Sequence, residues 1–92
     1  MLELVKKALR ITTTAFDDEI QLLINAGLED LGRAGVMGEV LTEDSTPLVQ
    51  RAVITYVKMN FGLPEDYDRL KRSYDEQKAQ LGTATGYTDW RD

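Results

Sequence analysis

Two pairs of neighbouring acids, Asp17-Asp18 and Glu65-Asp66, are the residues of this chain whose type is best suited to chemistry. Paired carboxylates can perform general acid–base catalysis or hold a metal ion. Adjacent positions on a helix point in different directions, however, and both pairs stand where a helix is predicted to start and negative charge is favoured. We therefore interpret both pairs as structural.

The residue types of most other catalytic designs are missing. The 92 residues include no Cys and no His, which excludes a thiolate nucleophile, an imidazole base and the usual zinc ligands. The segment Gly32-Arg33-Ala34-Gly35 is too short, and too poor in glycine, lysine and hydroxyl residues, for a phosphate-binding loop. The sequence therefore predicts no enzyme, no cofactor and no metal site.

Two aromatic residues near the C-terminus, Tyr87 and Trp90, are the clearest candidates for a binding function. They stand with Thr85 and Gly86 on a polar segment, where an aromatic side chain can anchor a partner by filling a pocket. The alternative is that both rings fold back onto the core of their own chain. We favour docking, because the predicted helices can cover one another without this segment.

Two further groups of residues are candidates for contact with a neighbouring subunit. The first is apolar and lies in a segment without helical period, whose alternative role is to cover its own core. The second is the charged face of the last predicted helix, whose simpler interpretation is a solvated surface with ion pairs worth about 0.2 to 0.5 kcal/mol each. The candidates are Val36, Met37, Val40 and Leu41 in the first group and Arg69, Arg72, Asp75 and Glu76 in the second.

Composition places these residues on one small globular domain. Hydrophobic residues make up 42% of the chain, yet no apolar run approaches the roughly 20 residues that cross a bilayer. The N-terminus lacks the basic and apolar regions of a signal peptide, so a cytoplasmic protein is expected. The net charge of -5 opposes binding to phosphates, which makes independent DNA binding improbable.

The first two of four predicted helices are amphipathic, with apolar residues at three- and four-residue spacing. The second is expected to begin with Thr14 and Asp17 as a capping box and to end at Gly32 and Gly35. Gly27 lies on its apolar face and permits close approach of another helix. The apolar positions are Leu2, Val5, Ala8 and Leu9 in the first helix and Phe16, Ile20, Leu23, Ile24, Leu28 and Leu31 in the second.

The third helix is predicted to begin at Pro47 and to end before Gly62, and the fourth to run from Pro64 to Gly82. The third carries apolar residues on several faces, so we expect it to be the most buried. The fourth has a narrow apolar stripe, so most of it should face water or a polar partner. These positions are Val49, Ala52, Val53, Tyr56 and Val57 in the third helix and Tyr67, Leu70, Tyr74 and Leu81 in the fourth.

The predicted fold is therefore all-α, a small bundle of four helices with a long loop between the second and third. We expect residues 1–82 to form the helical domain and residues 83–92 a flexible C-terminal tail, because the tail has too little apolar surface to fold independently.

Six segments of the chain form a specific combination when their order and spacing are taken together. They are Val5-Lys6-Lys7-Ala8-Leu9-Arg10-Ile11, Asp17-Asp18-Glu19-Ile20, Ala26-Gly27-Leu28-Glu29-Asp30-Leu31, Pro47-Leu48-Val49-Gln50-Arg51-Ala52-Val53, Tyr56-Val57-Lys58 and the segment from Tyr67 to Tyr87. This combination resembles the small head-tail connector (adaptor) proteins of long-tailed bacteriophages, and the similarity covers nearly the whole chain.

The resemblance implies a structural protein of the virion rather than an enzyme. About twelve copies would form a ring beneath the portal protein, extend the DNA channel, and bind the next head-completion or tail protein. DNA would pass without sequence-specific binding, and no membrane is involved. The tail with Tyr87 and Trp90 would dock on the portal. The protein would occur at the head–tail interface of the virion, and in the host bacterial cytoplasm during assembly.

A small helical interaction or regulatory domain, dimeric through its third helix, is the alternative. The helix lengths imitate a helix-turn-helix, but a recognition helix needs polar and basic residues grouped for base edges. The third helix offers only Gln50, Arg51, Lys58 and Asn60, scattered among apolar residues. A salt-dependent shift with duplex DNA would favour this alternative, and a large cyclic oligomer would exclude it.

Overall fold

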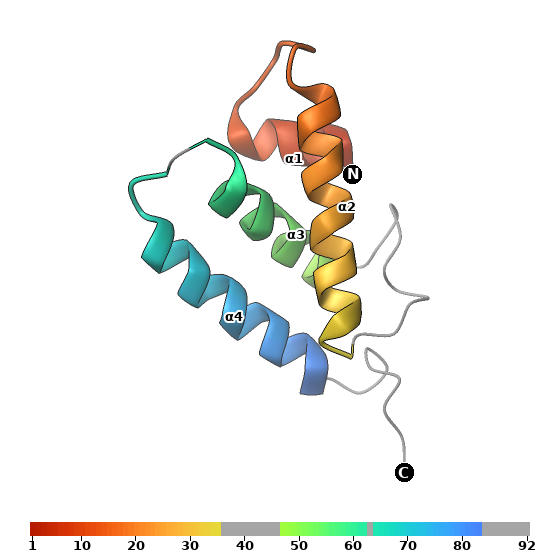
Figure 1. The fold of residues 1–92 in the computed structure, drawn as a ribbon, viewed down its shortest axis with the longest axis vertical. Coiled ribbons are helices and arrows are strands. Elements are labelled where there is room, and N and C mark those ends of the chain that lie inside the picture. Colours follow the sequence, from red (N-terminus) through yellow and green to blue (C-terminus); the bar gives the residue numbers. More distant parts are fainter. Residues whose placement is uncertain (36–46, 63, 84–92) are drawn as a thin grey trace.

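The fold is known from a computed structural model, which describes residues 1–35, 47–62 and 64–83. These residues form four α-helices and no strand (Figure 1). The predicted all-α class and the four-helix bundle are confirmed. The helices are α1 (Leu2–Leu9), α2 (Asp17–Arg33), α3 (Pro47–Asn60) and α4 (Tyr67–Thr83).

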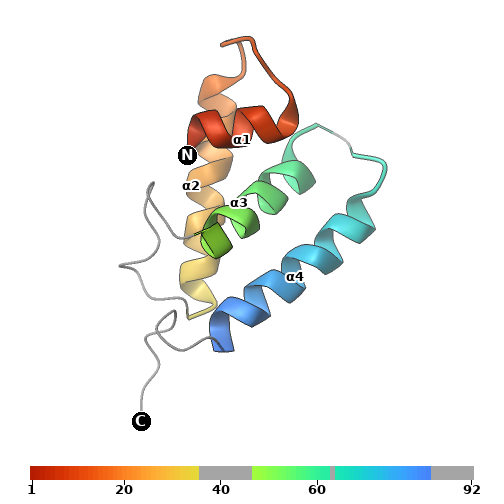
Figure 2. The same ribbon diagram turned by 180° about the vertical axis from the view of Figure 1, so that it is seen from behind.

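Helix α3 lies between α2 and α4 and makes most of its contacts with these two (Figures 1 and 2). Six of its fourteen residues are buried, the largest share of any helix, which confirms that it is the most buried one. Helix α1 packs on α2 and on α3. The core consists of Val5, Ile20, Ile24, Leu31, Val49, Ala52, Val53, Val57, Met59, Leu70, Tyr74 and Leu81.

Helices α2 and α3 approach closely at Gly27, as its place on the apolar face predicts. Gly27 is buried, and a Cβ atom there would lie 3.1 Å from Cδ1 of Tyr56. The missing side chain leaves room for the aromatic ring. In the middle of a helix, glycine lowers the stability of the helix by roughly 1 kcal/mol relative to alanine. Gly27 therefore weakens α2 itself but allows α2 to pack closely against Tyr56.

The start of α2 differs from the prediction. Phe16 occupies the N-cap position and no side chain caps the helix, so the proposed capping box of Thr14 and Asp17 is wrong. A backbone hydrogen bond closes the turn instead, in which the Asp17 N–H donates to the Thr14 carbonyl at 3.2 Å. Phe16 is 43% exposed and packs edge-on against Phe61, with ring centroids 5.5 Å apart, so it is not part of the core.

The helix ends predicted from glycine residues are correct where the backbone adopts a positive φ. Gly35 follows α2 with φ +96° and Gly62 follows α3 with φ +74°, a conformation that favours glycine. The expected stops at Gly32 and Gly82 are wrong, because α2 continues to Arg33 and α4 to Thr83. Helical φ and ψ angles are open to glycine as well, so glycine alone does not end a helix.

The start of α4 is also later than predicted. The helix begins at Tyr67, and Pro64, Glu65 and Asp66 precede it. The Asp66 carbonyl accepts the first helical hydrogen bond, from the Leu70 N–H at 3.0 Å. The residues before Tyr67 therefore belong to the connection from α3.

A buried ion pair joins α1 to the first residue of α2. Lys6 is 6% exposed, and its Nζ lies 2.7 Å from Oδ1 of Asp17. Lysine is seldom buried without a partner, and here the fold encloses both the side chain and its ion pair. Removing one partner of such a pair leaves an uncompensated charge in a poorly hydrated site, so Lys6 and Asp17 depend on each other.

We expect Gly27→Leu to lower the free energy of unfolding by about 1 to 3 kcal/mol, because the new side chain overlaps the Tyr56 ring. Urea unfolding followed by circular dichroism measures this loss. Asn25→Leu, at an exposed position of the same helix, should stay within about 0.5 kcal/mol of the wild type.

Adding Tyr56→Ala to Gly27→Leu should cost less than the two single changes summed, because the leucine fills the space that the ring leaves. Strict additivity of the two effects would contradict the close contact.

Candidate functional site

Helix α4 has an apolar and a polar side. Leu70, Tyr74 and Leu81 are buried in the core, as their spacing predicts, whereas Tyr67 is 40% exposed. The other side consists mainly of charged residues. This division leaves a long polar surface on the outside of the bundle.

We use the term outer face of α4 for six residues that line one shallow hollow along this helix. Three of the four predicted interface residues of α4, Arg72, Asp75 and Glu76, belong to it. The fourth, Arg69, pairs with Asp66 and lines a different hollow. The tertiary structure therefore divides the predicted set. The outer face consists of Asp68, Lys71, Arg72, Asp75, Glu76 and Ala79.

Charges of both signs alternate along the outer face. Lys71 Nζ donates to Asp75 Oδ2 at 3.1 Å, and this hydrogen bond raises the pKa of Lys71. Arg72 and Glu76 form no ion pair among the residues that the structure describes. Exposed ion pairs contribute about 0 to 1 kcal/mol, so a partner can rearrange this surface at little cost. The arrangement suits binding to a complementary charged surface.

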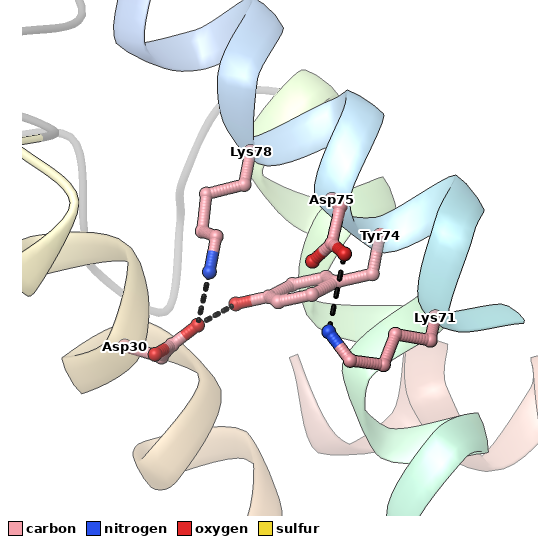
Figure 3. Close-up of polar contacts among 5 residues, drawn as sticks. All are labelled: Asp30, Lys71, Tyr74, Asp75 and Lys78. Carbon is pink, nitrogen blue, oxygen red and sulfur yellow. Dashed lines mark hydrogen bonds and ion pairs between the residues drawn. The ribbon is translucent and has the colours of Figure 1, made fainter. Parts of the chain in front are cut away.

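A polar cluster on the inner side of α4 connects it to α2 (Figure 3). The Tyr74 hydroxyl donates to Oδ2 of Asp30 at 2.6 Å, and Lys78 Nζ donates to the same oxygen at 3.3 Å. The Lys78 ammonium also lies 5.1 Å from the centroid of the Tyr74 ring. Tyr74 in turn contacts Tyr56 of α3, with ring centroids 5.4 Å apart. One cluster thus joins three helices.

The contacts in this cluster shift the pKa values of both Asp30 and Tyr74. Burial alone would raise the pKa of the Asp30 carboxyl, but hydrogen bonds from Tyr74 and Lys78 outweigh it and hold that pKa below its usual value. Burial, followed by the hydrogen bond to the Asp30 carboxylate, raises the pKa of Tyr74 above its usual value. The phenol therefore stays protonated as a donor, which suits a structural contact.

Sequence analysis did not find this cluster. It placed Tyr74 in the apolar stripe and assigned no contact to Asp30 or Lys78. A signal was present, because a buried tyrosine hydroxyl usually has a hydrogen-bond partner. The sequence alone did not indicate which of the sixteen acids would supply it.

The other predicted contact residues lie outside the described residues and remain predictions. Within the described part of the chain, no group of three or more metal-ligating side chains occurs. No helix there is long and apolar enough to cross a membrane. The predicted residues outside are Val36, Met37, Val40 and Leu41 in the connection between α2 and α3, and Thr85, Gly86, Tyr87 and Trp90 near the C-terminus.

Comparison with known proteins places this fold in a family. The profile of the family described as phage connector protein matches residues 1–88. The chain belongs to this family. Neither curated proteins nor solved structures gave a match. The resemblance predicted from the sequence segments is thus confirmed, and the match includes Tyr87 but ends before Trp90.

Membership assigns this connector a structural role between the head and the tail of a phage, as a component of the virion. The geometry agrees with that role. The outer face of α4 offers charges for binding, and the cluster around Asp30 holds the helix that carries them.

We expect Tyr74→Phe to lower the free energy of unfolding at pH 7 by about 1.5 to 3 kcal/mol, because Asp30 loses a hydrogen bond to a charged group. Urea unfolding measures the loss. Tyr67→Phe, on the exposed side of the same helix, is the matched control and should change little.

The difference between wild type and Tyr74→Phe should depend on pH. The raised pKa of Tyr74 stabilises the folded state below the unfolded tyrosine value of about 10, and that contribution disappears as the pH rises further. The lowered pKa of Asp30 stabilises it above the unfolded aspartate value of about 3.9, and that contribution disappears in acid. The difference should therefore shrink at both extremes. A constant difference from pH 3 to 11 would contradict the cluster.

Proposed function

We propose that this connector forms a closed ring of about twelve copies beneath the portal protein, extends the DNA channel, and binds the next head-completion or tail protein. The outer face of α4 is the observation that supports this proposal most directly. Arg72 and Glu76 lie on this face, and neither forms an ion pair within the described part of the chain. Their charges are therefore free to bind a partner surface of complementary charge.

A ring requires two different complementary surfaces on each subunit, because its contacts are head-to-tail. The outer face of α4 is one candidate. The apolar residues Val36, Met37, Val40 and Leu41 are candidates for another. The hydrogen bond between Tyr74 and Asp30 supports the first, because a helix fixed before binding loses less freedom in the complex.

The charge of the connector suits a passage for DNA. A net charge of -5 disfavours retention of phosphates, whereas a basic channel lining would hold them. We therefore propose that the inner surface of the ring is not basic and makes no sequence-specific contact with DNA. A basic inner surface in a structure of the ring would refute this part of the proposal.

We propose that the residues after α4 form an arm that docks on the portal. Because α4 includes Thr83, the boundary expected between residues 82 and 83 moves to residues 83 and 84. The buried core supports this division, because among the described residues its last member is Leu81. Tyr87 and Trp90 are the candidate anchors, with Thr85 and Gly86 beside them. Aromatic side chains are suited to filling pockets on a partner.

The packing of α3 disfavours the alternative of a dimer formed through that helix. Six of its residues, including Val53 and Val57, are already buried within the chain. Its exposed positions include Arg51 and Asn60, which are polar. A second copy would therefore find little free apolar surface on α3.

Light scattering over a range of concentrations should detect a species of about twelve subunits, either for the connector alone or after addition of the portal protein. A concentration-independent monomer or dimer that ignores the portal would refute the ring. Arg72→Glu should weaken assembly and Lys7→Glu should not, because Lys7 is exposed on α1 and does not line the outer face of α4.

Deletion of residues 84–92 should abolish binding to the portal protein in a pull-down experiment, while the circular dichroism spectrum keeps its helical signal. The expected reason is that all four helices pack on a core formed by the described residues, from Val5 to Leu81. Loss of helical signal would place the segment in the fold. Unchanged portal binding would assign docking to another surface.

A further inference from the structure

A second hollow lies where α1, the end of α3 and the start of α4 meet. We call it the junction hollow. Ala8 and Leu9 of α1 line it together with Phe61 and Pro64 of the connection after α3, and all four are half-buried. The remaining lining residues are Leu70, Asp66 and two cations, Lys58 and Arg69. The lining is thus partly apolar and partly charged, which suits an apolar group that stands next to a carboxylate.

Lys58 gives the junction hollow its uncompensated charge. Arg69 pairs with Asp66, but Lys58 forms no ion pair with any residue that the structure describes.

Residues 36–46 have the complementary composition. The segment contains four large apolar residues, three acids and no lysine or arginine. Glu39 stands two positions after Met37 and directly before Val40, so large apolar residues lie close to this carboxylate in the sequence. The acids are Glu39, Glu43 and Asp44.

The positions of the two ends indicate which copy supplies the segment. It is attached after Gly35 and before Pro47, at the N-terminal end of α3, whereas the junction hollow is lined by Lys58 and Phe61 at the C-terminal end. The 14 residues of α3 span roughly 21 Å. Eleven residues fastened at both ends reach at most about 20 Å from their attachments, and only when fully stretched. The junction hollow of the same copy is therefore at the limit of reach.

We propose that the junction hollow of each connector subunit binds residues 36–46 of a neighbouring copy. The two contact surfaces lie at opposite ends of α3, so the same contact repeats from subunit to subunit. The inference rests on the proposed ring and names one of its interfaces. Apolar residues of the neighbour contact Leu9 and Phe61, and its acids face Lys58.

Disulfide cross-linking tests the contact. Because the chain contains no cysteine, every disulfide must form between introduced residues. One variant carries both Ala8→Cys and Met37→Cys and is oxidised at concentrations where the wild type assembles. The expected product is a ladder of covalent multimers, each copy linked to the next. An intramolecular disulfide would show that the segment occupies its own hollow, and the absence of cross-links would show that it binds elsewhere. Either result would overturn the proposal.

The matched control combines Met37→Cys with Leu22→Cys, since Leu22 is 67% exposed on α2 and does not line the junction hollow. It should give no ladder. A ladder of equal yield would reveal random collision and overturn the assignment.

Charge reversal provides a second test. Lys58→Glu and Glu39→Lys should each weaken assembly roughly tenfold, and the double variant should recover most of the loss. Two single variants that assemble like the wild type, or a double variant without recovery, would refute this pairing.

Light scattering of the wild type separates this inference from the proposed function. If the wild type assembles but the ladder is missing, only the contact is wrong. If it stays monomeric with and without the portal protein, both the ring and the contact are refuted. A ladder without a closed ring would support the contact and contradict the ring.

Discussion

Burial of α3 between α2 and α4 is the interaction on which the rest of this connector depends. Val49, Val53 and Val57 of α3 are fully buried, and each contributes about 1.5 to 3 kcal/mol relative to an exposed side chain. Exposed ion pairs contribute about 0 to 1 kcal/mol, so apolar contacts with α3 determine how the other helices lie. Helices α2 and α4 must both direct apolar residues inward, and their polar faces then form the outside.

This constraint also explains why α4 needs a polar contact. Its apolar stripe is narrow, and its contacts are mainly with α3. The hydrogen bond from Tyr74 to Asp30 connects it to α2 and limits its movement along α3. The helix that carries the charged outer face is thereby held in one position, although its exposed side chains can still rearrange. A structural protein of a phage joint needs such surfaces, because its contacts must form in the same geometry in every copy.

Much of the fold could be predicted because the apolar periodicity is strong. Ile20, Ile24 and Leu31 identify the buried side of α2, and Pro47 and Gly62 mark the limits of α3. The predicted capping box at Thr14 failed because a backbone turn satisfies the same groups. The outer face of α4 was foreseen as a charged surface, but its separation from Arg69 was not, since both stand on one helix and differ only in their neighbours.

By itself, the sequence determined the helical class, the buried stripes and the family, because these depend on residue type and spacing along the chain. Only the tertiary structure decided that Lys6 is buried against Asp17 and that Asp30 receives the Tyr74 hydroxyl. It also decided that Ala8, Lys58 and Pro64 line one hollow. These residues are far apart in sequence, and no local preference links them. They meet because helices that bury α3 must bring particular polar and apolar positions together.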